Sequence, residues 1–180
     1  MERITDQEIA TAAAEFGLET ASVKAVLAVE SGGRGFGTDG KIIIQFEPSW
    51  FKRKAPYAPS GLWTQNKVER QAAEWVAFND AFAKDANAAM ESTSIGLMQV
   101  MGFHYRLLGF KTVGDMWDYA RKSELNQLRL GLLFIKSNAK MYNALKENNF
   151  ATFAHYYNGV QYKKFNYDTR LEEAYNKALK

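Results

Sequence analysis

The sequence predicts a mainly helical (α+β) fold with one small β-sheet region. Most of its 180 residues fall into segments whose apolar positions recur at three- and four-residue spacing, as in helices that pack on a core. One β-branched segment, residues 41–47, alternates like a strand and is bounded by Gly40 and Pro48. No repeat, low-complexity tract or linker divides the chain, so we expect a single domain over residues 1–180, without a separate wall-binding domain.

Capping residues and breakers set the expected boundaries of the elements. Thr5 and Glu8 have the spacing of a capping box at the start of the first helix. The other helices are expected at about 20–31, 66–82, 85–91, 112–120, 123–137, 149–157 and 167–179. In the helix at 66–82 the predicted apolar stripe is Val68, Ala72, Trp75, Phe78 and Phe82. The glycine-rich residues 32–40 are expected to form a loop, and residues 48–63, which hold all three prolines, an irregular segment.

Composition restricts the function classes. The chain has no cysteine, which excludes disulfides and any cysteine nucleophile or metal ligand. Its net charge of +3 favours anionic partners only weakly. Residues 1–18 lack the pattern of a signal peptide, and no apolar run approaches the roughly 20 residues that span a bilayer. We therefore expect a monomer without stable membrane insertion.

A carboxyl group lies on an apolar helix face. Val23, Val26 and Leu27 form one stripe of the helix at 20–31, and the next position of that stripe is Glu30. Burial disfavours the ionised form of a carboxyl group, so the pKa rises and the group keeps its proton near neutrality. A general acid needs this property, although a last-turn glutamate can also turn out to solvent.

A second carboxyl group, Glu47, follows the predicted strand. Alternation places Ile42, Ile44 and Phe46 on one face of the strand and Glu47 on the polar face. Glycosidases use two carboxyl groups in different environments, one protonated and one ionised. Glu30 and Glu47 are the leading candidates for such a pair, and a solvated strand end is the alternative for Glu47.

Other catalytic chemistries find little support. His104 and His155 are the only histidines, and neither belongs to a metal-binding helix pattern. The chain has no Gly-x-Ser-x-Gly elbow and no Walker or dinucleotide fingerprint. We therefore expect neither a metal ion nor another cofactor.

Three separated segments carry a family resemblance. They read A-V-E-S-G-G-R-G-F at 28–36, followed by I-I-I-Q-F-E-P-S-W-F at 42–51; I-G-L-M-Q-V-M-G-F-H-Y at 95–105; and Y-N-G-V-Q-Y-K-K-F-N-Y-D-T-R-L-E-E-A-Y at 157–175. In this order they resemble the phage endolysin N-acetylmuramidase family, which is similar to goose-type lysozymes and lytic transglycosylases. The resemblance implies a lysozyme-like fold and hydrolysis of the β-1,4 bond between N-acetylmuramic acid and N-acetylglucosamine in peptidoglycan.

The resemblance also implies roles for single residues. Glu30 matches the catalytic acid, and Glu47 matches the acidic position after the strand, as a base or as a stabiliser of the transition state. Gln99 matches a residue that lines the sugar cleft, where its amide can donate and accept hydrogen bonds. Tyr157 and Asn158 match the segment that closes the pocket of the acid. Such a protein is made in the cytoplasm of the bacterial host and acts on peptidoglycan in the periplasm or cell wall.

Three alternatives remain at this stage. A lytic transglycosylase would release 1,6-anhydromuramic acid and needs a single acid–base glutamate. A non-catalytic peptidoglycan-binding or tail-structural module would bind the wall without releasing sugar. The basic run Lys52 to Lys54 suggests nucleic-acid binding only weakly, and we expect no nucleic-acid partner.

Overall fold

The computed structural model describes residues 3–30, 33–65 and 70–180. Within them the helices are α1 (Asp6–Glu15), α2 (Thr20–Glu30), α3 (Pro48–Lys54), α4 (Gln71–Lys84), α5 (Ala86–Glu91), α6 (Val113–Ala120), α7 (Glu124–Lys136), α8 (Ala139–Lys146), α9 (Phe150–Asn158) and α10 (Tyr167–Ala178). The strands are β1 (Ile44–Phe46), β2 (Thr93–Ile95) and β3 (Val100–Met101). Short 3-10 helices are η1 (Leu62–Gln65), η2 (Gly102–His104) and η3 (Tyr162–Phe165).

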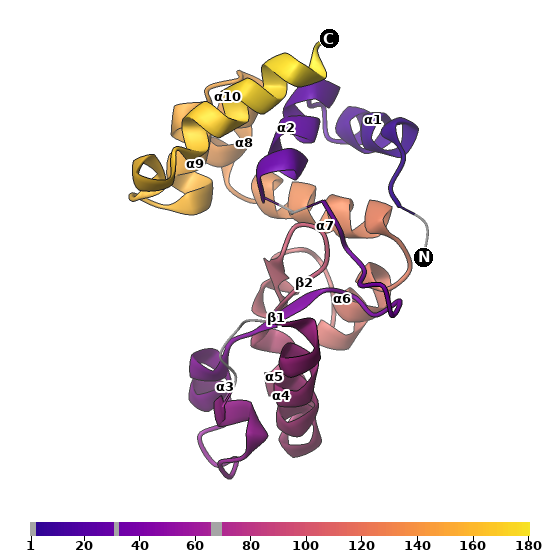
Figure 1. The fold of residues 1–180 in the computed structure, drawn as a ribbon, viewed down its shortest axis with the longest axis vertical. Coiled ribbons are helices and arrows are strands. Elements are labelled where there is room, and N and C mark those ends of the chain that lie inside the picture. Colours follow the sequence, from indigo (N-terminus) through magenta and orange to yellow (C-terminus); the bar gives the residue numbers. More distant parts are fainter. Residues whose placement is uncertain (1–2, 31–32, 66–69) are drawn as a thin grey trace.

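Figure 1 shows an elongated molecule with two lobes and α7 between them. One lobe consists of α1, α2 and α8 to α10, and α10 packs along α2. The other lobe contains the sheet and α3 to α6. The sheet is antiparallel, in the order β1-β2-β3. No helix of the described residues is long and apolar enough to cross a membrane.

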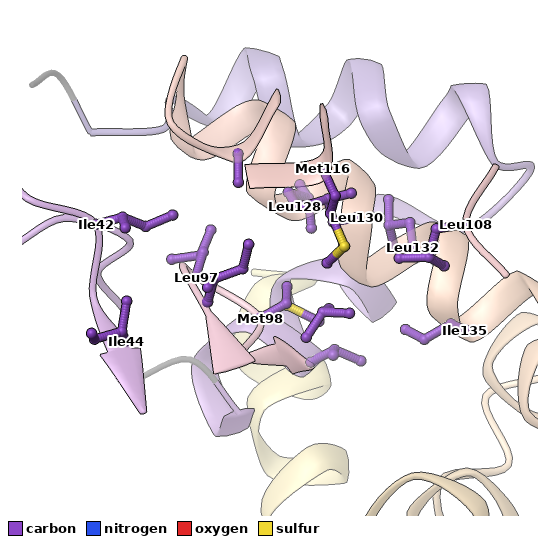
Figure 2. Close-up of a cluster of buried hydrophobic side chains, with 14 of the residues drawn as sticks. Ile42, Ile44, Leu97, Met98, Leu108, Met116, Leu128, Leu130, Leu132 and Ile135 are labelled. Atoms are coloured by element: carbon purple, nitrogen blue, oxygen red, sulfur yellow. The ribbon is translucent and has the colours of Figure 1, made fainter. Parts of the chain in front are cut away.

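Helix α7 is buried on several sides because both lobes pack on it. Leu128, Leu130, Leu132 and Ile135 are each at most 1% exposed, although they do not lie on one face. Figure 2 shows these side chains close to those of the sheet region and of α6. The buried apolar residues of both lobes form one contiguous cluster.

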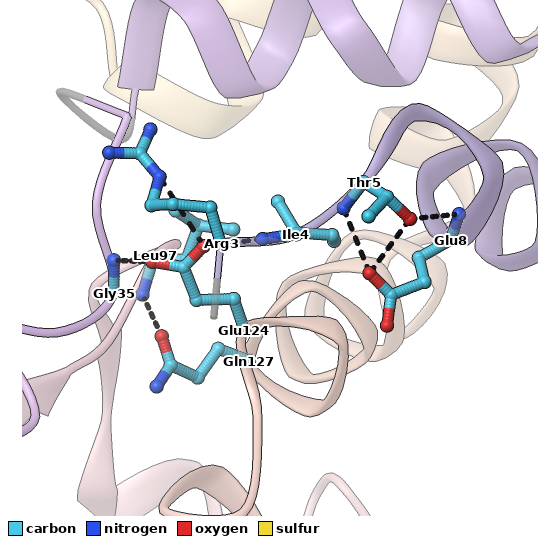
Figure 3. A network of polar contacts seen from close by, with 8 residues as sticks. All are labelled: Arg3, Ile4, Thr5, Glu8, Gly35, Leu97, Glu124 and Gln127. Carbon is cyan, nitrogen blue, oxygen red and sulfur yellow. Dashed lines mark hydrogen bonds and ion pairs between the residues drawn. The ribbon is translucent and has the colours of Figure 1, made fainter. Parts of the chain in front are cut away.

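Two buried polar side chains of α7 hold the loops that flank it. The Glu124 carboxylate accepts hydrogen bonds from the backbone N–H groups of Gly35 (2.7 Å) and Ile4 (2.8 Å). The Gln127 amide oxygen accepts from the N–H of Leu97 (2.8 Å), and its nitrogen donates to the carbonyl of Ala120 (3.1 Å). Figure 3 shows the bonds from Gly35, Ile4 and Leu97 to these side chains. Helix α7 thereby fixes the glycine loop and the turn between β2 and β3.

Helix α4 covers the free edge of β1. The Gln71 side chain exchanges two hydrogen bonds with the backbone of Ile44 (2.9 and 2.8 Å), and the Glu74 carboxylate accepts from the N–H of Phe46 (2.8 Å). These side chains satisfy backbone groups that a neighbouring strand would otherwise pair.

The structure confirms most of the predicted helix starts. Thr5 and Thr112 form capping boxes, and Asp85, Ser123 and Asn149 each cap the helix that follows. Asn138 caps α8, a separate helix that was not predicted. The inward positions predicted for α6 are all buried: Val113, Met116, Trp117 and Ala120.

The structure refines other predictions of local structure. The strand at 41–47 is shorter, because only residues 44–46 pair with β2, although its buried face is the predicted one. The sheet is small, as predicted, and two short strands that were not predicted, β2 and β3, complete it. Residues 48–63 are partly helical, since Pro48 occupies the first turn of α3, where its missing N–H costs nothing.

The predicted apolar stripe of α4 was displaced. Its buried residues are Glu74, Ala77, Phe78 and Ala81, whereas Phe82 is exposed and Ala72 lies at the surface. The bond from Phe46 to Glu74 turns this polar residue inward, which hydrophobic periodicity does not reveal. Val68 lies outside the described residues.

Replacing Gly35 with alanine should destabilise the fold by about 1–3 kcal/mol, as overpacked core positions do. An added Cβ would lie 1.8 Å from the Gln127 amide oxygen, which is already bonded to Leu97. Denaturant unfolding measures the loss. Gly114→Ala is the matched control, because its Cβ would meet its nearest neighbour at an ordinary 3.6 Å. Equal stability of the two variants would contradict the role assigned to Gln127.

Candidate active site

A cavity of about 280 Å³ lies where the two lobes meet at α7. Its wall combines the end of α2, the β2–β3 turn, η2, α7 and the end of α9. The lining residues are Glu30, Met98, Gln99, Val100, Met101, His104, Phe134, Tyr157 and Asn158. Four of the five residues singled out in the sequence, Glu30, Gln99, Tyr157 and Asn158, therefore line one cavity.

Glu30 is the last residue of α2, and Asn158 is the last residue of α9. The Asn158 side-chain nitrogen lies 3.0 Å and 3.1 Å from the two carboxylate oxygens of Glu30 and donates to them. The two residues are 128 positions apart, so this contact depends on the packing of the whole helical lobe. The amide fixes the orientation of the carboxyl group at the cavity wall.

The environment of Glu30 favours its protonated form. Burial raises the pKa of its carboxyl group above the ordinary value, against the opposing effects of the Asn158 hydrogen bond and the Arg170 charge. The position at the C-terminal end of α2 acts in the same direction as burial, because the helix dipole is negative there and repels a carboxylate.

Tyr157 lies close to the carboxyl group but is not bonded to it. Burial, and then the nearby charge of Glu30, raise the pKa of the Tyr157 hydroxyl. Among the described residues, no hydrogen bond joins this hydroxyl to Glu30. Its ring packs between those of Phe153 and Phe134, at 5.2 Å and 6.2 Å. The cavity therefore keeps Tyr157 neutral, with its ring fixed.

Gln99 uses its amide to shape the turn. Its backbone is left-handed (φ 48°), an unfavourable conformation for a residue with a side chain. The amide oxygen accepts from the Ser94 hydroxyl (2.9 Å), and the amide nitrogen donates to the Gly96 carbonyl (2.7 Å). The expected amide is thus at the cavity wall, but its hydrogen bonds are directed to the protein.

Glu47 lies outside the lining of this cavity. It precedes α3, and its carboxylate accepts a hydrogen bond from the Gln45 amide (3.0 Å). Burial, with a smaller effect of the Glu74 charge, raises the pKa of Glu47 as well. Burial therefore raises the pKa of both carboxyl groups, and the expected division into one protonated and one ionised group stays a prediction.

His104 and Phe134 also line the cavity, although the sequence analysis gave them no role. The His104 ring lies 4.9 Å from that of Phe134 and 4.3 Å from that of Phe103. Burial lowers the pKa of His104, which favours the neutral imidazole. The only feature of the sequence that indicated a role for His104 is its place in the family-like segment 95–105. No feature of the sequence distinguished Phe134 from the core residues of α7.

The geometry suits acid–base chemistry. A carboxyl group whose pKa is raised by burial lies in a cavity with aromatic walls and an amide partner, features that glycosidase sites share. Within the described residues no three side chains of the metal-ligating types are grouped. Fold and site together define a glycosidase of the helical, carboxyl-dependent kind.

Comparisons with known proteins identify the family. The family model described as N-acetylmuramidase matches residues 19–179, and the chain belongs to this family. The crystal structure of the Burkholderia AP3 phage endolysin is similar to the chain, with a TM-score of 0.86 and 32% sequence identity over 98% of this chain and 71% of the other. No curated protein matches. The chain is thus an endolysin-type muramidase, a glycoside hydrolase that acts on peptidoglycan.

Replacing Glu30 with glutamine should stabilise the fold at neutral pH by a few degrees in Tm, since about 1 kcal/mol corresponds to roughly 3 °C at this size. A raised pKa means that the folded state binds the proton more tightly than the unfolded state. The protonated carboxyl group therefore contributes stability below the unfolded pKa, and this contribution is lost as pH rises through the folded value.

Thermal unfolding at pH 7 and at pH 3.5 measures this difference. The advantage of Glu30→Gln over the wild type should be present at pH 7 and vanish at pH 3.5. Glu172→Gln, at an exposed position of α10, is the control and should show no such dependence. A Glu30→Gln variant that is less stable than the wild type at pH 7 would contradict the environment described for Glu30.

Proposed function

We propose that Glu30 is the general acid of this muramidase. The observation that carries the proposal is that Glu30 supplies the only carboxyl group in the lining of the described cavity, where Asn158 orients it. Protonated Glu30 would give its proton to the oxygen that joins N-acetylmuramic acid to N-acetylglucosamine. The bond from the sugar carbon to that oxygen then breaks, and a water oxygen replaces it on the carbon.

Asn158 supports both halves of this cycle. When Glu30 has lost its proton, the two contacts from the Asn158 amide nitrogen stabilise the carboxylate. The amide oxygen of Asn158 is buried and has no hydrogen-bond partner among the described residues. We assign it to a sugar N–H or hydroxyl group of the substrate, which would satisfy it. Tyr157 completes the wall beside the acid, and Gln99 contributes by holding the β2–β3 turn in place.

Glu47 is the proposed second carboxyl group, either as the base toward water or as a stabiliser of positive charge in the transition state. Its support is its place at the end of β1, in the sheet that also carries the turn of Gln99. Gln45, which bonds to Glu47, pairs with Ser94, and Ser94 bonds to Gln99. This chain of contacts connects Glu47 to the cavity wall.

We further propose that one chain is sufficient for activity and that the enzyme acts as a monomer. Its support is that Glu30 and the residue that orients it, Asn158, both belong to this chain. The proposed route leads from the cytoplasm of the bacterial host to the peptidoglycan of the periplasm or cell wall, where hydrolysis lyses the cell.

Replacing Glu30 with glutamine should lower hydrolysis of purified sacculi by about two to four orders of magnitude, the usual contribution of a general acid. The amide keeps the shape of the side chain but has no proton to transfer. Release of soluble sugar fragments measures the loss, and circular dichroism checks the fold. A folded variant with near-wild-type hydrolysis would refute the assignment.

The role of Glu47 is tested with Glu47→Gln and mass spectrometry of the fragments. The two-carboxylate mechanism predicts that Glu47→Gln loses at least tenfold in kcat. It also predicts that the fragments released by the wild-type enzyme end in reducing muramic acid. Fragments lighter by one water would show that the muramic acid hydroxyl, not water, attacks the sugar carbon. Undiminished activity of Glu47→Gln would remove Glu47 from the mechanism and leave Glu30 as the acid.

A further inference from the structure

A row of aromatic side chains leaves the cavity and reaches the surface of the sheet lobe. Tyr157 contacts Phe134 at 6.2 Å between ring centroids, and Phe134 contacts His104 at 4.9 Å. His104 contacts Phe103 at 4.3 Å, and Phe103 contacts Trp50 at 4.8 Å. The first three rings line the cavity with Glu30, and the last belongs to α3 on the other lobe.

These rings are not simply core. Trp50 is 37% exposed, and the other four are partly exposed. The next residue of α3, Phe51, is fully buried and packs on Phe46 and Trp63 at 5.9 Å and 5.0 Å. Phe51 therefore anchors α3 to the core, and the position of Trp50 at the surface is not needed for that purpose.

The far end of the row carries positive charge. The Arg53 guanidinium lies 5.2 Å from the centre of the Trp50 ring. Lys54 is ion-paired with Glu91, but no ion pair is found for Arg53 among the described residues. An exposed arginine beside an aromatic ring favours a carboxylate ligand attached to an apolar or ring-shaped group.

We propose that this aromatic row binds the glycan strand on one side of the bond that is cleaved, and that Trp50 and Phe103 hold the sugar unit farthest from Glu30. This inference rests on the proposed function, because the row begins in the cavity of the proposed acid. A pyranose ring has an apolar face of C–H groups that packs on aromatic rings. The peptide attached to N-acetylmuramic acid supplies carboxylates, and Arg53 is placed to bind one of them.

The observations favour a sugar polymer over other occupants. The row is continuous with the cavity, so a ligand on it extends from the cleavage site. Its rings come from α9, α7, η2 and α3, so an occupant must cross both lobes, as an extended strand does. A globular partner would contact the exposed end alone and would not enter the cavity.

The test measures binding in the background of Glu30→Gln, so that it does not depend on catalysis. Calorimetry compares this variant with Glu30→Gln/Trp50→Ala for two ligands. The first is purified glycan strands that carry peptides, and the second is short muropeptides that occupy the cavity but do not reach Trp50. The proposal predicts about tenfold weaker binding of the long strands and unchanged binding of the short ones. Adding Arg53→Gln to Glu30→Gln should weaken binding only of strands that carry peptides.

Glu30→Gln/Phe82→Ala is the matched control, since Phe82 is 42% exposed on the same lobe and its ring contacts that of Phe78, away from the row. Equal affinity of the Trp50 variant and its parent for long strands would overturn the aromatic row while leaving Glu30 as the acid. Full hydrolysis by Glu30→Gln would refute the acid without affecting the binding result. Equal weakening by the Trp50 and Phe82 variants would also overturn the row, because the effect would not be specific to it.

Discussion

The buried side chains of Glu124 and Gln127 are the interaction on which the cavity depends. A helix that lies between two lobes cannot hold loops in place by apolar packing alone, because backbone N–H groups of those loops need partners. Glu124 supplies one for Gly35 and Gln127 one for Leu97. A buried carboxylate or amide of this kind is costly when left unpaired, so the loops and α7 stabilise one another.

This constraint explains the glycines around α7. Gly35 and Gly96 leave the space that the Gln127 side chain occupies, and Gly131 leaves space for Met98. Met98 and Gln99 follow directly in the turn and line the cavity. The hydrogen bonds and close contacts between the turn and α7 therefore fix the positions of Met98 and Gln99 in the cavity wall.

The position of Glu30, the proposed acid, depends on a second constraint, the contact between two helix ends. Glu30 ends α2 and Asn158 ends α9, so each side chain leaves its helix at the cavity. Burial and the helix end favour the protonated carboxyl group, whereas the Asn158 amide favours the carboxylate. This balance suits a group that must release a proton and take it back in each cycle.

Local sequence patterns were sufficient for most helix starts but not for the site. Thr5, Asp85 and Thr112 predicted helix starts because capping depends on neighbouring residues alone. The strands β2 and β3 are two or three residues long and almost wholly buried, so they show no alternation to detect. The family resemblance assigned Asn158 to the segment that closes the pocket of the acid, but its contact with Glu30 was not predicted, because it joins residues far apart in the chain.

The same limit applies to residues whose surroundings local patterns do not predict. Glu47 was paired with Glu30 because it ends a strand on the polar face, but a pattern of alternation does not say which cavity that face borders. The sequence also suggested that Gln99 binds sugar through its amide, whereas the tight turn around Gly96 occupies that amide. Trp50 and His104 lie in one aromatic row only because Phe103 of η2 contacts both of their rings.

The central claim is that Glu30 holds the proton that the reaction uses. The most direct measurement is the titration of the Glu30 side-chain carboxyl carbon by NMR, compared with the pH dependence of kcat/KM. The account predicts that Glu30 titrates above the ordinary glutamate range and that activity falls on the alkaline side at the same pH. A Glu30 that titrates at its ordinary value, or an alkaline limb that follows another group, would contradict it.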